Sequence, residues 1–131
     1  MKNLIVGYGV VGNNLHKELK KLPHEIYDKN KHIYPEDNFH NIAFVCVPTE
    51  LKEDGLLDIS IVEEVINKIN ANIFVIKSTI PVGTTDKLKE KYSNKRIVFS
   101  PEYYGGTQHC NNFDFNFTIL GGDKKDCLEV Q

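Results

Sequence analysis

The stretch GYGVVG at residues 7–12 decides how this sequence folds, because it joins a short apolar run to a helical pattern. Residues 2–6 are mostly apolar and end in β-branched side chains, which predicts a buried strand. Leucine and valine side chains recur at helical spacing over residues 10–22, and Pro23 ends the predicted helix. A strand, a turn with the spacing GxGxxG and a helix form a unit whose backbone N–H groups can hold phosphate groups. The turn is therefore a candidate phosphate-binding turn.

Each glycine of this turn has its own role in such a unit. Gly7 permits the tight turn out of the strand, Gly9 lets the backbone approach a pyrophosphate, and Gly12 lets the helix pack closely on the sheet. The residues between them belong to the same turn. The expected cofactor-binding residues of the turn are therefore Gly7, Tyr8, Gly9, Val10, Val11 and Gly12.

An acidic residue stands where this motif requires one. A second strand is predicted over residues 24–28, and Asp28 at its end follows Gly7 by about 20 positions. A carboxylate there accepts hydrogen bonds from the adenosine ribose and repels a 2′-phosphate, so the sequence favours NAD over NADP. Lys29 and Lys31 leave NADP open as an alternative. A glycine turn in a nucleotide-free domain of the same fold is a second alternative.

The remaining chain alternates buried strands with amphipathic helices. Further strands are predicted over residues 42–47, 73–76, 96–99 and 117–120, and helices over residues 58–70 and 83–92 and from Asp123 onward. This order predicts an α/β fold: a Rossmann-type doubly wound, mainly parallel sheet of about six strands with helices on both faces. No linker interrupts the pattern, so we expect residues 1–131 to form one dinucleotide-binding domain.

Composition and charge exclude several classes of function. A net charge of −2 and an isoelectric point near 6.2 give no electrostatic reason to expect nucleic acid or an anionic membrane as a partner. No apolar stretch approaches the ~20 residues that span a bilayer, and no signal peptide is recognisable, so we expect a cytoplasmic protein. Cys46, Cys110 and Cys127 form no CxxC pair, and the histidines lack metal-ligand spacing, so no metal site is expected.

Three further stretches are more specific than the glycine turn. They are FVCVPTE at residues 44–50, VIKSTIPVGTT at residues 75–85 and VFSPEYYGG at residues 98–106. Together with GYGVVG, and in this order, they resemble the N-terminal NAD-binding domain of the UDP-glucose/GDP-mannose dehydrogenase family over nearly the whole chain. The resemblance implies an NAD-dependent oxidoreductase that converts the C6 alcohol of a nucleotide sugar, such as UDP-glucose, to a carboxylate in two successive oxidations.

The resemblance also implies roles for residues in these stretches. Thr49 would contact the adenosine side of NAD. Ser78 and Thr79 would lie along the cofactor, with Thr79 near the nicotinamide, where it would help to order a catalytic water. Glu102 would be a second catalytic residue, placed at the reacting carbon to move a proton or activate water. The loop that would bind the sugar nucleotide comprises Glu102, Tyr103, Tyr104, Gly105 and Gly106.

The chain also departs from the pattern of this family. The family's nucleophilic cysteine lies in a later domain, and this chain stops at Gln131, before that substrate domain and before the central helix that usually builds the dimer. Glu50 replaces a usual proline, and Gly105-Gly106 replaces a usual glutamate and glycine. We therefore expect an incomplete catalyst, which a C-terminal half or a partner chain would complete.

Two other functions stay open on the sequence alone. The chain could be a stand-alone NAD-binding or sensing module without turnover. It could also belong to another dehydrogenase class that shares GxGxxG, such as the 3-hydroxyacid or 6-phosphogluconate type. Those enzymes are not expected to carry KSTxPVGTT followed by SPE, which favours the nucleotide-sugar dehydrogenase.

Overall fold

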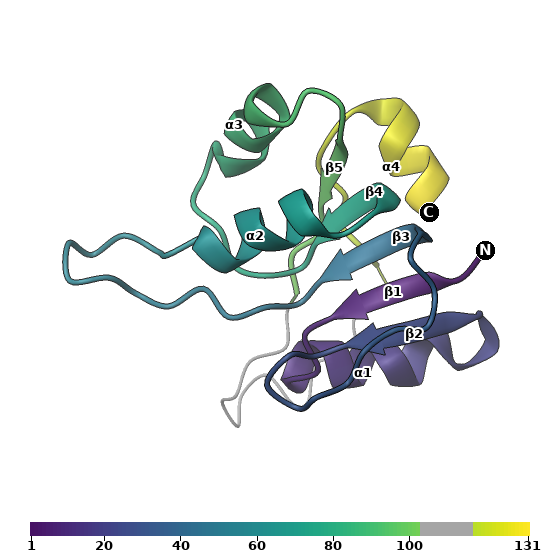
Figure 1. The fold of residues 1–131 in the computed structure, drawn as a ribbon. Helices are drawn as coiled ribbons and strands as arrows, with labels where there is room; N and C mark the ends of the chain where they lie inside the picture. The colour runs from purple at the N-terminus through teal and green to yellow at the C-terminus, as the bar shows by residue number, and fades with distance from the viewer. Residues whose placement is uncertain (103–116) are drawn as a thin grey trace.

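A parallel sheet between two layers of helices forms the body of the molecule (Figure 1). The computed structural model describes residues 1–102 and 117–131. The strands are β1 (Asn3–Val6), β2 (His24–Tyr27), β3 (His40–Val45), β4 (Ala71–Ile76) and β5 (Arg96–Phe99), all parallel and in the order β2-β1-β3-β4-β5. The helices are α1 (Val10–Glu18), the short 3₁₀ helix η1 (Leu19–Lys21), α2 (Ser60–Lys68), α3 (Thr84–Lys91) and α4 (Lys124–Val130). No helix in the described part of the chain has the length and apolar character needed to cross a membrane.

Each face of the sheet has its own core. Along β1, Leu4 and Val6 are buried on the face that α2 and α3 cover, and Ile5 is buried on the face that α1 and α4 cover. The apolar runs of β3 and β4 divide between the two faces in the same alternating way. A continuous apolar run is what a parallel strand needs when helices cover both of its faces. The doubly wound α/β fold predicted from the sequence is confirmed.

The order of the strands places a ligand crevice at the edge where β1 and β3 end. The chain passes from β1 through α1 to β2 on one side, and then returns past β1 to β3 on the other side. Where the connections after two neighbouring strands run in opposite directions, a crevice opens at the carboxyl ends of these strands. Open α/β sheets bind their ligands in this crevice. The glycine turn directly follows β1 and therefore lies at this crevice (Figure 1).

The predicted sixth strand, over residues 117–120, is wrong. Within the described residues the sheet has five strands, and this part of the chain adds a single antiparallel bridge between Gly121 and Phe99. Phe117 and Ile119 are 54% and 47% exposed. The segment therefore lacks the fully buried face that would hold it in the sheet as a strand.

Two helices are shorter than their apolar patterns predict. The helix predicted over residues 10–22 divides into α1 and η1, and the Leu22 N–H closes the last turn by donating to the Leu19 carbonyl oxygen at 2.8 Å. Pro23 follows immediately and cannot continue a helix. The helix predicted from residue 58 begins at Ser60, because the Asp58 side chain accepts a hydrogen bond from the Ser60 N–H at 2.9 Å and holds a turn there.

Candidate dinucleotide-binding site

The three motif glycines of the turn differ in what the fold demands of them. Gly7 has a φ of 93°, and a Cβ there would lie 2.5 Å from the carbonyl oxygen of Cys46. A Cβ on Gly12 would lie 2.0 Å from the carbonyl oxygen of Gly7. A Cβ on Gly9 would meet no atom within 4 Å. The fold therefore excludes side chains at Gly7 and Gly12, whereas the space beside Gly9 is open.

This open space lies at the N-terminus of α1. Gly9 is the N-cap residue, so no side chain caps the N–H groups of the first turn. The first turn of α1 also contains no acidic residue. Free N–H groups and the positive end of the helix dipole attract an anion, and the turn therefore suits a phosphate group.

The Asp28 carboxylate braces the glycine turn. Its Oδ2 accepts a hydrogen bond from the Tyr8 N–H at 2.8 Å, and its Oδ1 accepts hydrogen bonds from the N–H groups of Asn30 and Lys31 at 3.0 Å. Burial by itself would raise the pKa of Asp28, but these backbone hydrogen bonds outweigh burial and hold the pKa below its ordinary value. Oδ2 accepts only one of these hydrogen bonds and keeps a further lone pair, so Asp28 can also accept a hydrogen bond from a ligand.

The Lys31 side chain is a second brace of the same turn. Its ammonium group donates to the carbonyl oxygen of Tyr8 and lies 5.1 Å from the centroid of the Tyr8 ring. On another side, the Tyr8 ring meets the His16 ring edge-on, with 5.8 Å between the centroids. The turn thus engages one of the three N–H donors of the Lys31 ammonium group.

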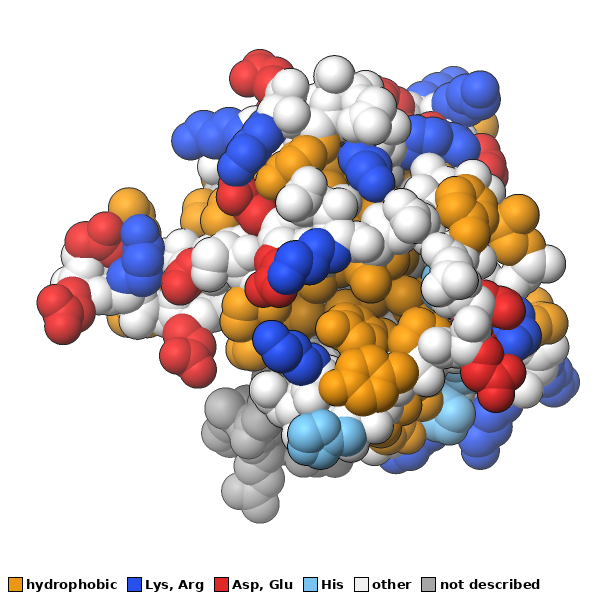
Figure 2. Space-filling view, viewed as in Figure 1, with side chains coloured by type: hydrophobic (Ala, Val, Ile, Leu, Met, Phe, Trp, Pro, Cys, Tyr) orange, Lys and Arg blue, Asp and Glu red, His pale blue; other side chains and the backbone are white. Residues whose placement is uncertain are grey.

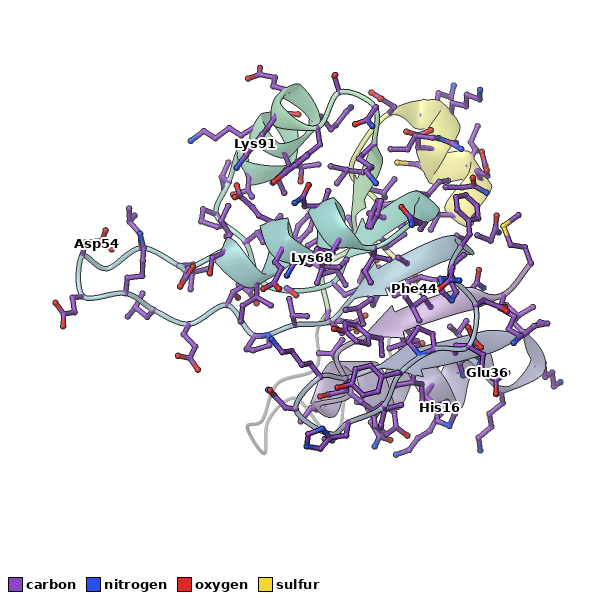
Figure 3. The ribbon with its side chains drawn as sticks, in the orientation of Figure 1. His16, Glu36, Phe44, Asp54, Lys68 and Lys91 are labelled. Atoms are coloured by element: carbon purple, nitrogen blue, oxygen red, sulfur yellow. The ribbon has the colours of Figure 1, made fainter. Side chains whose placement is uncertain are left out.

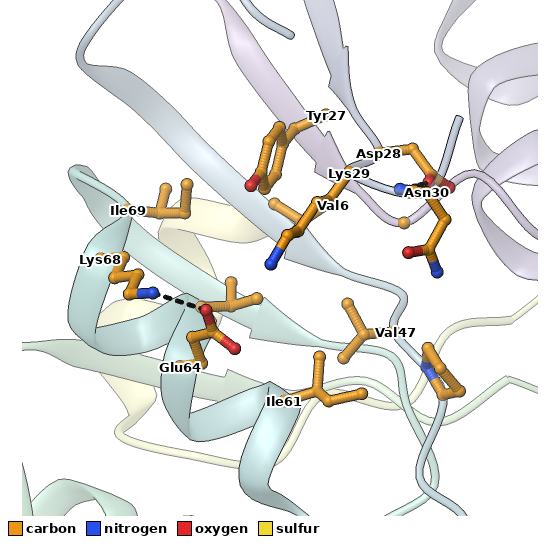
Figure 4. Close-up of a pocket in the computed structure, with 13 residues that line it drawn as sticks. Val6, Tyr27, Asp28, Lys29, Asn30, Val47, Ile61, Glu64, Lys68 and Ile69 are labelled. Atoms are coloured by element: carbon orange, nitrogen blue, oxygen red, sulfur yellow. Dashed lines mark hydrogen bonds and ion pairs between the residues drawn. The ribbon is translucent and has the colours of Figure 1, made fainter. Parts of the chain in front are cut away.

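A first cavity of about 270 Å³ lies on the β2 side of the glycine turn (Figure 4). Asp28 and Asn30 stand on one side of this cavity, and the ion pair between Glu64 and Lys68 of α2, at 2.6 Å, stands on the other. Apolar side chains form much of the remaining lining: Val6, Tyr27, Val47, Ile61, Val65 and Ile69. Figure 2 shows apolar side chains gathered in a hollow on this face of the molecule. An apolar slot beside a carboxylate suits a flat ring that carries a hydroxylated sugar.

A second cavity, of about 240 Å³, lies on the other side of the turn, at the carboxyl ends of β3 and β4. Four residues predicted for the site line it together: Thr49, Ser78, Thr79 and Glu102. The Thr49 hydroxyl donates to the Thr79 carbonyl oxygen at 2.7 Å, and the Ser78 hydroxyl donates to the Val47 carbonyl oxygen at 2.7 Å. These two hydroxyls join the loop after β3 to the loop after β4, and so fix the shape of the cavity.

Lys77 is a residue of this cavity that the sequence analysis did not single out. Its ammonium group forms an ion pair with the Glu102 carboxylate and donates a hydrogen bond to the Ser100 hydroxyl at 3.2 Å. The side chains of Lys77 and Glu102 are only 9% and 18% exposed. The sequence could have indicated this pair, because Lys77 directly follows β4 and Glu102 closely follows β5. These two strands are parallel neighbours, so the residues that follow them lie close together.

Cys46 also lines the second cavity, but it is not equipped to act as a nucleophile. Burial raises the pKa of its thiol, with a smaller opposing effect of Lys77, to about 12. A thiol with such a pKa stays protonated at neutral pH, and the thiolate is the nucleophilic form. Within the described residues, no three His, Cys, Asp or Glu side chains are grouped so that they could hold a metal ion.

Most of the predicted site residues that the structure describes line these two cavities. Asp28 borders the first cavity, and Val11 joins the residues of the second cavity. Thr49 was expected on the adenosine side, but it lines the second cavity beside Thr79 rather than the first. Val10 is 60% exposed at the start of α1. The predicted substrate-loop residues Tyr103, Tyr104, Gly105 and Gly106 lie outside the described residues.

The fold and the site together define a class of protein. A parallel sheet with a GxGxxG turn at its switch point and an acidic residue after the second strand is a Rossmann dinucleotide-binding domain. Residues 10–131 match the sequence model of the UDP-glucose/GDP-mannose dehydrogenase family, NAD binding domain. The chain belongs to this family, and it is the family's NAD-binding domain.

Individual relatives agree with this assignment. The chain is 38% identical over 89 residues to the UDP-glucose 6-dehydrogenase of Campylobacter jejuni, a match that covers 64% of this chain and 23% of that protein. It is 36% identical over 77 residues to the UDP-glucose 6-dehydrogenase of Streptococcus pneumoniae, covering 55% of this chain and 19% of that protein. The fold is shared with the crystal structure of GDP-mannose dehydrogenase from Pseudomonas aeruginosa, which superimposes with a TM-score of 0.72 at 19% identity, covering 99% of this chain and 43% of that one. The matches thus span less than half of the length of these relatives.

Proposed function

We propose that this chain binds NAD across its glycine turn and serves as the cofactor-binding part of a dehydrogenase that oxidises the C6 alcohol of a nucleotide sugar. The observation that carries the proposal is the pair of cavities on opposite sides of one phosphate-binding turn. A dinucleotide has the matching layout, because a central pyrophosphate joins two nucleosides. Membership of the family supports the nucleotide sugar as the substrate class.

The adenosine half of NAD fits the first cavity. The pyrophosphate would sit beside Gly9, where the fold leaves space and α1 presents its N–H groups. The adenine ring would pack against the apolar lining, of which Ile61 and Val47 are part. A ribose hydroxyl would donate to Oδ2 of Asp28, whose pKa burial tends to raise but the backbone hydrogen bonds hold below its ordinary value. A charged carboxylate in this position disfavours the 2′-phosphate of NADP.

The nicotinamide half fits the second cavity, beside Thr79 and Glu102. NAD bound there would supply the hydride acceptor for the oxidation of the sugar carbon. Glu102 would take the proton of the alcohol, directly or through a water that the Thr79 hydroxyl helps to order. Ser78 would support the cofactor through the loop that it braces, since its hydroxyl is engaged by Val47. The sugar nucleotide would approach from the side of Glu102.

Calorimetric titration of the purified chain with NAD and with NADP tests this proposal. We expect NAD to bind at least about tenfold more tightly than NADP, because Asp28 repels the additional phosphate. Asp28→Ala should weaken NAD binding and reduce the preference for NAD. Asp54→Ala, in the exposed loop after β3, is a matched control that should change neither (Figure 3). An absence of binding heat with both cofactors would contradict the proposal.

A second experiment concerns turnover. The resemblance places the family's nucleophilic cysteine in a later domain, and a single domain leaves the reacting atoms open to water. We expect the isolated chain to bind NAD but not to oxidise UDP-glucose above background. The measurement is the absorbance of the NADH that this oxidation would form from NAD. Clear turnover would show that this chain supplies all of the chemistry by itself.

A further inference from the structure

The ion pair between Lys77 and Glu102 is the charged feature of the second cavity. Among the described residues that line this cavity, these two are the charged ones, and their side chains are 9% and 18% exposed. The Lys77 ammonium group is held by the Glu102 carboxylate and by the Ser100 hydroxyl at 3.2 Å. The pair therefore brings one positive and one negative charge into a site that is largely shielded from water.

The other described residues that line the second cavity carry no charge, and the carboxylate of Glu18 near the pair lines a different cavity. The thiol of Cys46 is neutral, because burial raises its pKa to about 12. Glu18, an exposed residue at the end of α1, is close enough to respond to the pair. Burial raises the pKa of Glu18, the charge of Glu102 raises it further and the charge of Lys77 lowers it. The wall of the cavity thus presents about zero net charge as long as both partners are present.

The two redox forms of the cofactor differ in charge at the ring. The nicotinamide of NAD⁺ carries one positive charge, and the dihydronicotinamide of NADH carries none. A fixed charge in a poorly hydrated cavity therefore changes the affinity for NAD⁺ without an equal change in the affinity for NADH. The opposite charges of Lys77 and Glu102 can therefore set the difference between the affinities for NAD⁺ and NADH.

We propose that Lys77 is a positioning residue that sets the preference of the site between NAD⁺ and NADH by neutralising Glu102. This inference rests on the proposed function, which places the nicotinamide in the second cavity. Without the lysine, an unbalanced carboxylate attracts the positive ring and strengthens binding of NAD⁺ relative to NADH. Without the charge on Glu102, an unbalanced ammonium group repels that ring and weakens binding of NAD⁺ relative to NADH.

The test is the ratio of the two dissociation constants, Kd for NADH divided by Kd for NAD⁺, measured on the full chain at pH 8. Lys77→Met should raise this ratio by at least about five- to tenfold, which is the effect of one unit charge about 4 Å away in bulk water, since the shielded cavity screens the charge less than water does. Glu102→Gln should lower it by a similar factor. The double variant should return near the ratio of the unsubstituted chain, because both charges are then absent.

Two controls separate charge from packing. Lys77→Arg keeps the positive charge and should keep the ratio. Lys91→Met removes a lysine from an exposed ion pair with Glu63, at 2.8 Å, on the far side of α2 from the first cavity (Figure 3). This variant should also keep the ratio. Circular dichroism shows whether each variant is folded.

The outcomes are distinguishable. Opposite shifts in the two single variants support the inference, and a loss of packing cannot produce them. Unchanged ratios, or shifts in the same direction, with NAD⁺ still bound, overturn the inference and leave the proposed function standing. Failure of the unsubstituted chain to bind either form contradicts the proposed function, and the inference fails with it.

Discussion

Gly9 and Gly12 belong to the same turn, yet the space around them differs, and this difference allows fold and function to be tested separately. A Cβ at Gly12 would lie 2.0 Å from the carbonyl oxygen of Gly7, and a Cβ at Gly9 would meet no atom within 4 Å. The surrounding protein therefore requires glycine at position 12. At position 9 the surrounding protein does not require glycine. Glycine is needed there because a side chain would occupy the space proposed for the pyrophosphate.

We predict that Gly9→Val leaves the stability of the chain nearly unchanged but removes NAD binding. Gly12→Ala should instead destabilise the fold by roughly 3 kcal/mol or more, because the new methyl group has no room beside a backbone carbonyl. Urea unfolding followed by circular dichroism, together with calorimetric titration of NAD, measures both effects. If Gly9→Val still bound NAD as tightly as the unsubstituted chain, the pyrophosphate would have to lie elsewhere.

Glu25 is the carboxylate whose charge matters most clearly to the folded state. It accepts hydrogen bonds from the His40 ring at 2.9 Å and the Lys2 ammonium group at 3.0 Å, and from the backbone N–H groups of Glu36 and Asp37. Burial tends to raise the pKa of Glu25, but these partners lower it to about 2. A group with a lowered pKa stabilises the fold above its unfolded pKa, and this contribution is lost as the pH falls towards 2.

We therefore predict that Glu25→Gln costs about 1–2 kcal/mol of stability at pH 7, after allowance for screening by solvent, and almost nothing near pH 2. Glu36→Gln, at an exposed position of the following loop, is the matched control and should have little effect at either pH. Denaturant unfolding at several pH values gives the comparison. An equal loss for Glu25→Gln at all pH values would show that shape rather than charge explains the effect.

At the scale of elements, α4 packs Cys127 and Val130 against the core of the sheet and is also attached to the sheet through one arginine. Arg96 at the start of β5 donates from Nε to the Asp126 carboxylate at 2.8 Å, and its guanidinium group also pairs with Glu129. The Asp126 side chain is only 9% exposed. Asp123 is the N-cap residue of α4, but its side chain makes no capping hydrogen bond and instead pairs with Lys89 at 2.7 Å. The helix is thus held by this packing and by ion pairs from the sheet and from α3.

We predict that Asp126→Ala destabilises the chain by about 2 kcal/mol, because it removes a buried partner of Arg96 and leaves that charge less well satisfied. Glu64→Gln breaks an exposed ion pair within α2 and should have no measurable effect on stability. The measurement is the free energy of unfolding of each variant, compared with that of the unsubstituted chain. Equal values would mean that α4 contributes little to the stability of the described fold.

Much of this fold could be predicted from the sequence, because the informative signals are local. The apolar runs of β3 and β4, the glycine turn and the proline after η1 each specify their own element without help from distant residues. The segment at 117–120 misled the prediction, since a short apolar run shows β propensity whether or not a neighbouring strand pairs with it. The extent of strand pairing is decided by tertiary contacts, and a single bridge at Gly121 is what the structure has.

The site was less predictable than the fold, because much of it also depends on tertiary contacts. Asp28 follows from its distance to the glycine turn, but the braces formed by Lys31 depend on how the loop after β2 folds back. The pairing of Lys77 with Glu102 joins residues that are far apart in sequence and meet only because β4 and β5 are neighbours. A motif names residues one stretch at a time, whereas the charge balance of a cavity depends on several stretches together.

At the scale of the whole molecule, the central claim is that one dinucleotide lies across the glycine turn and occupies both cavities. Titration of the ¹⁵N-labelled chain with NAD, followed by nuclear magnetic resonance, tests this claim most directly. We predict amide shifts at Gly9 and Val10, at Asp28 beside the first cavity and at Thr79 beside the second, all saturating with one dissociation constant. Shifts confined to one cavity, or an undisturbed glycine turn at saturating NAD, would contradict the account.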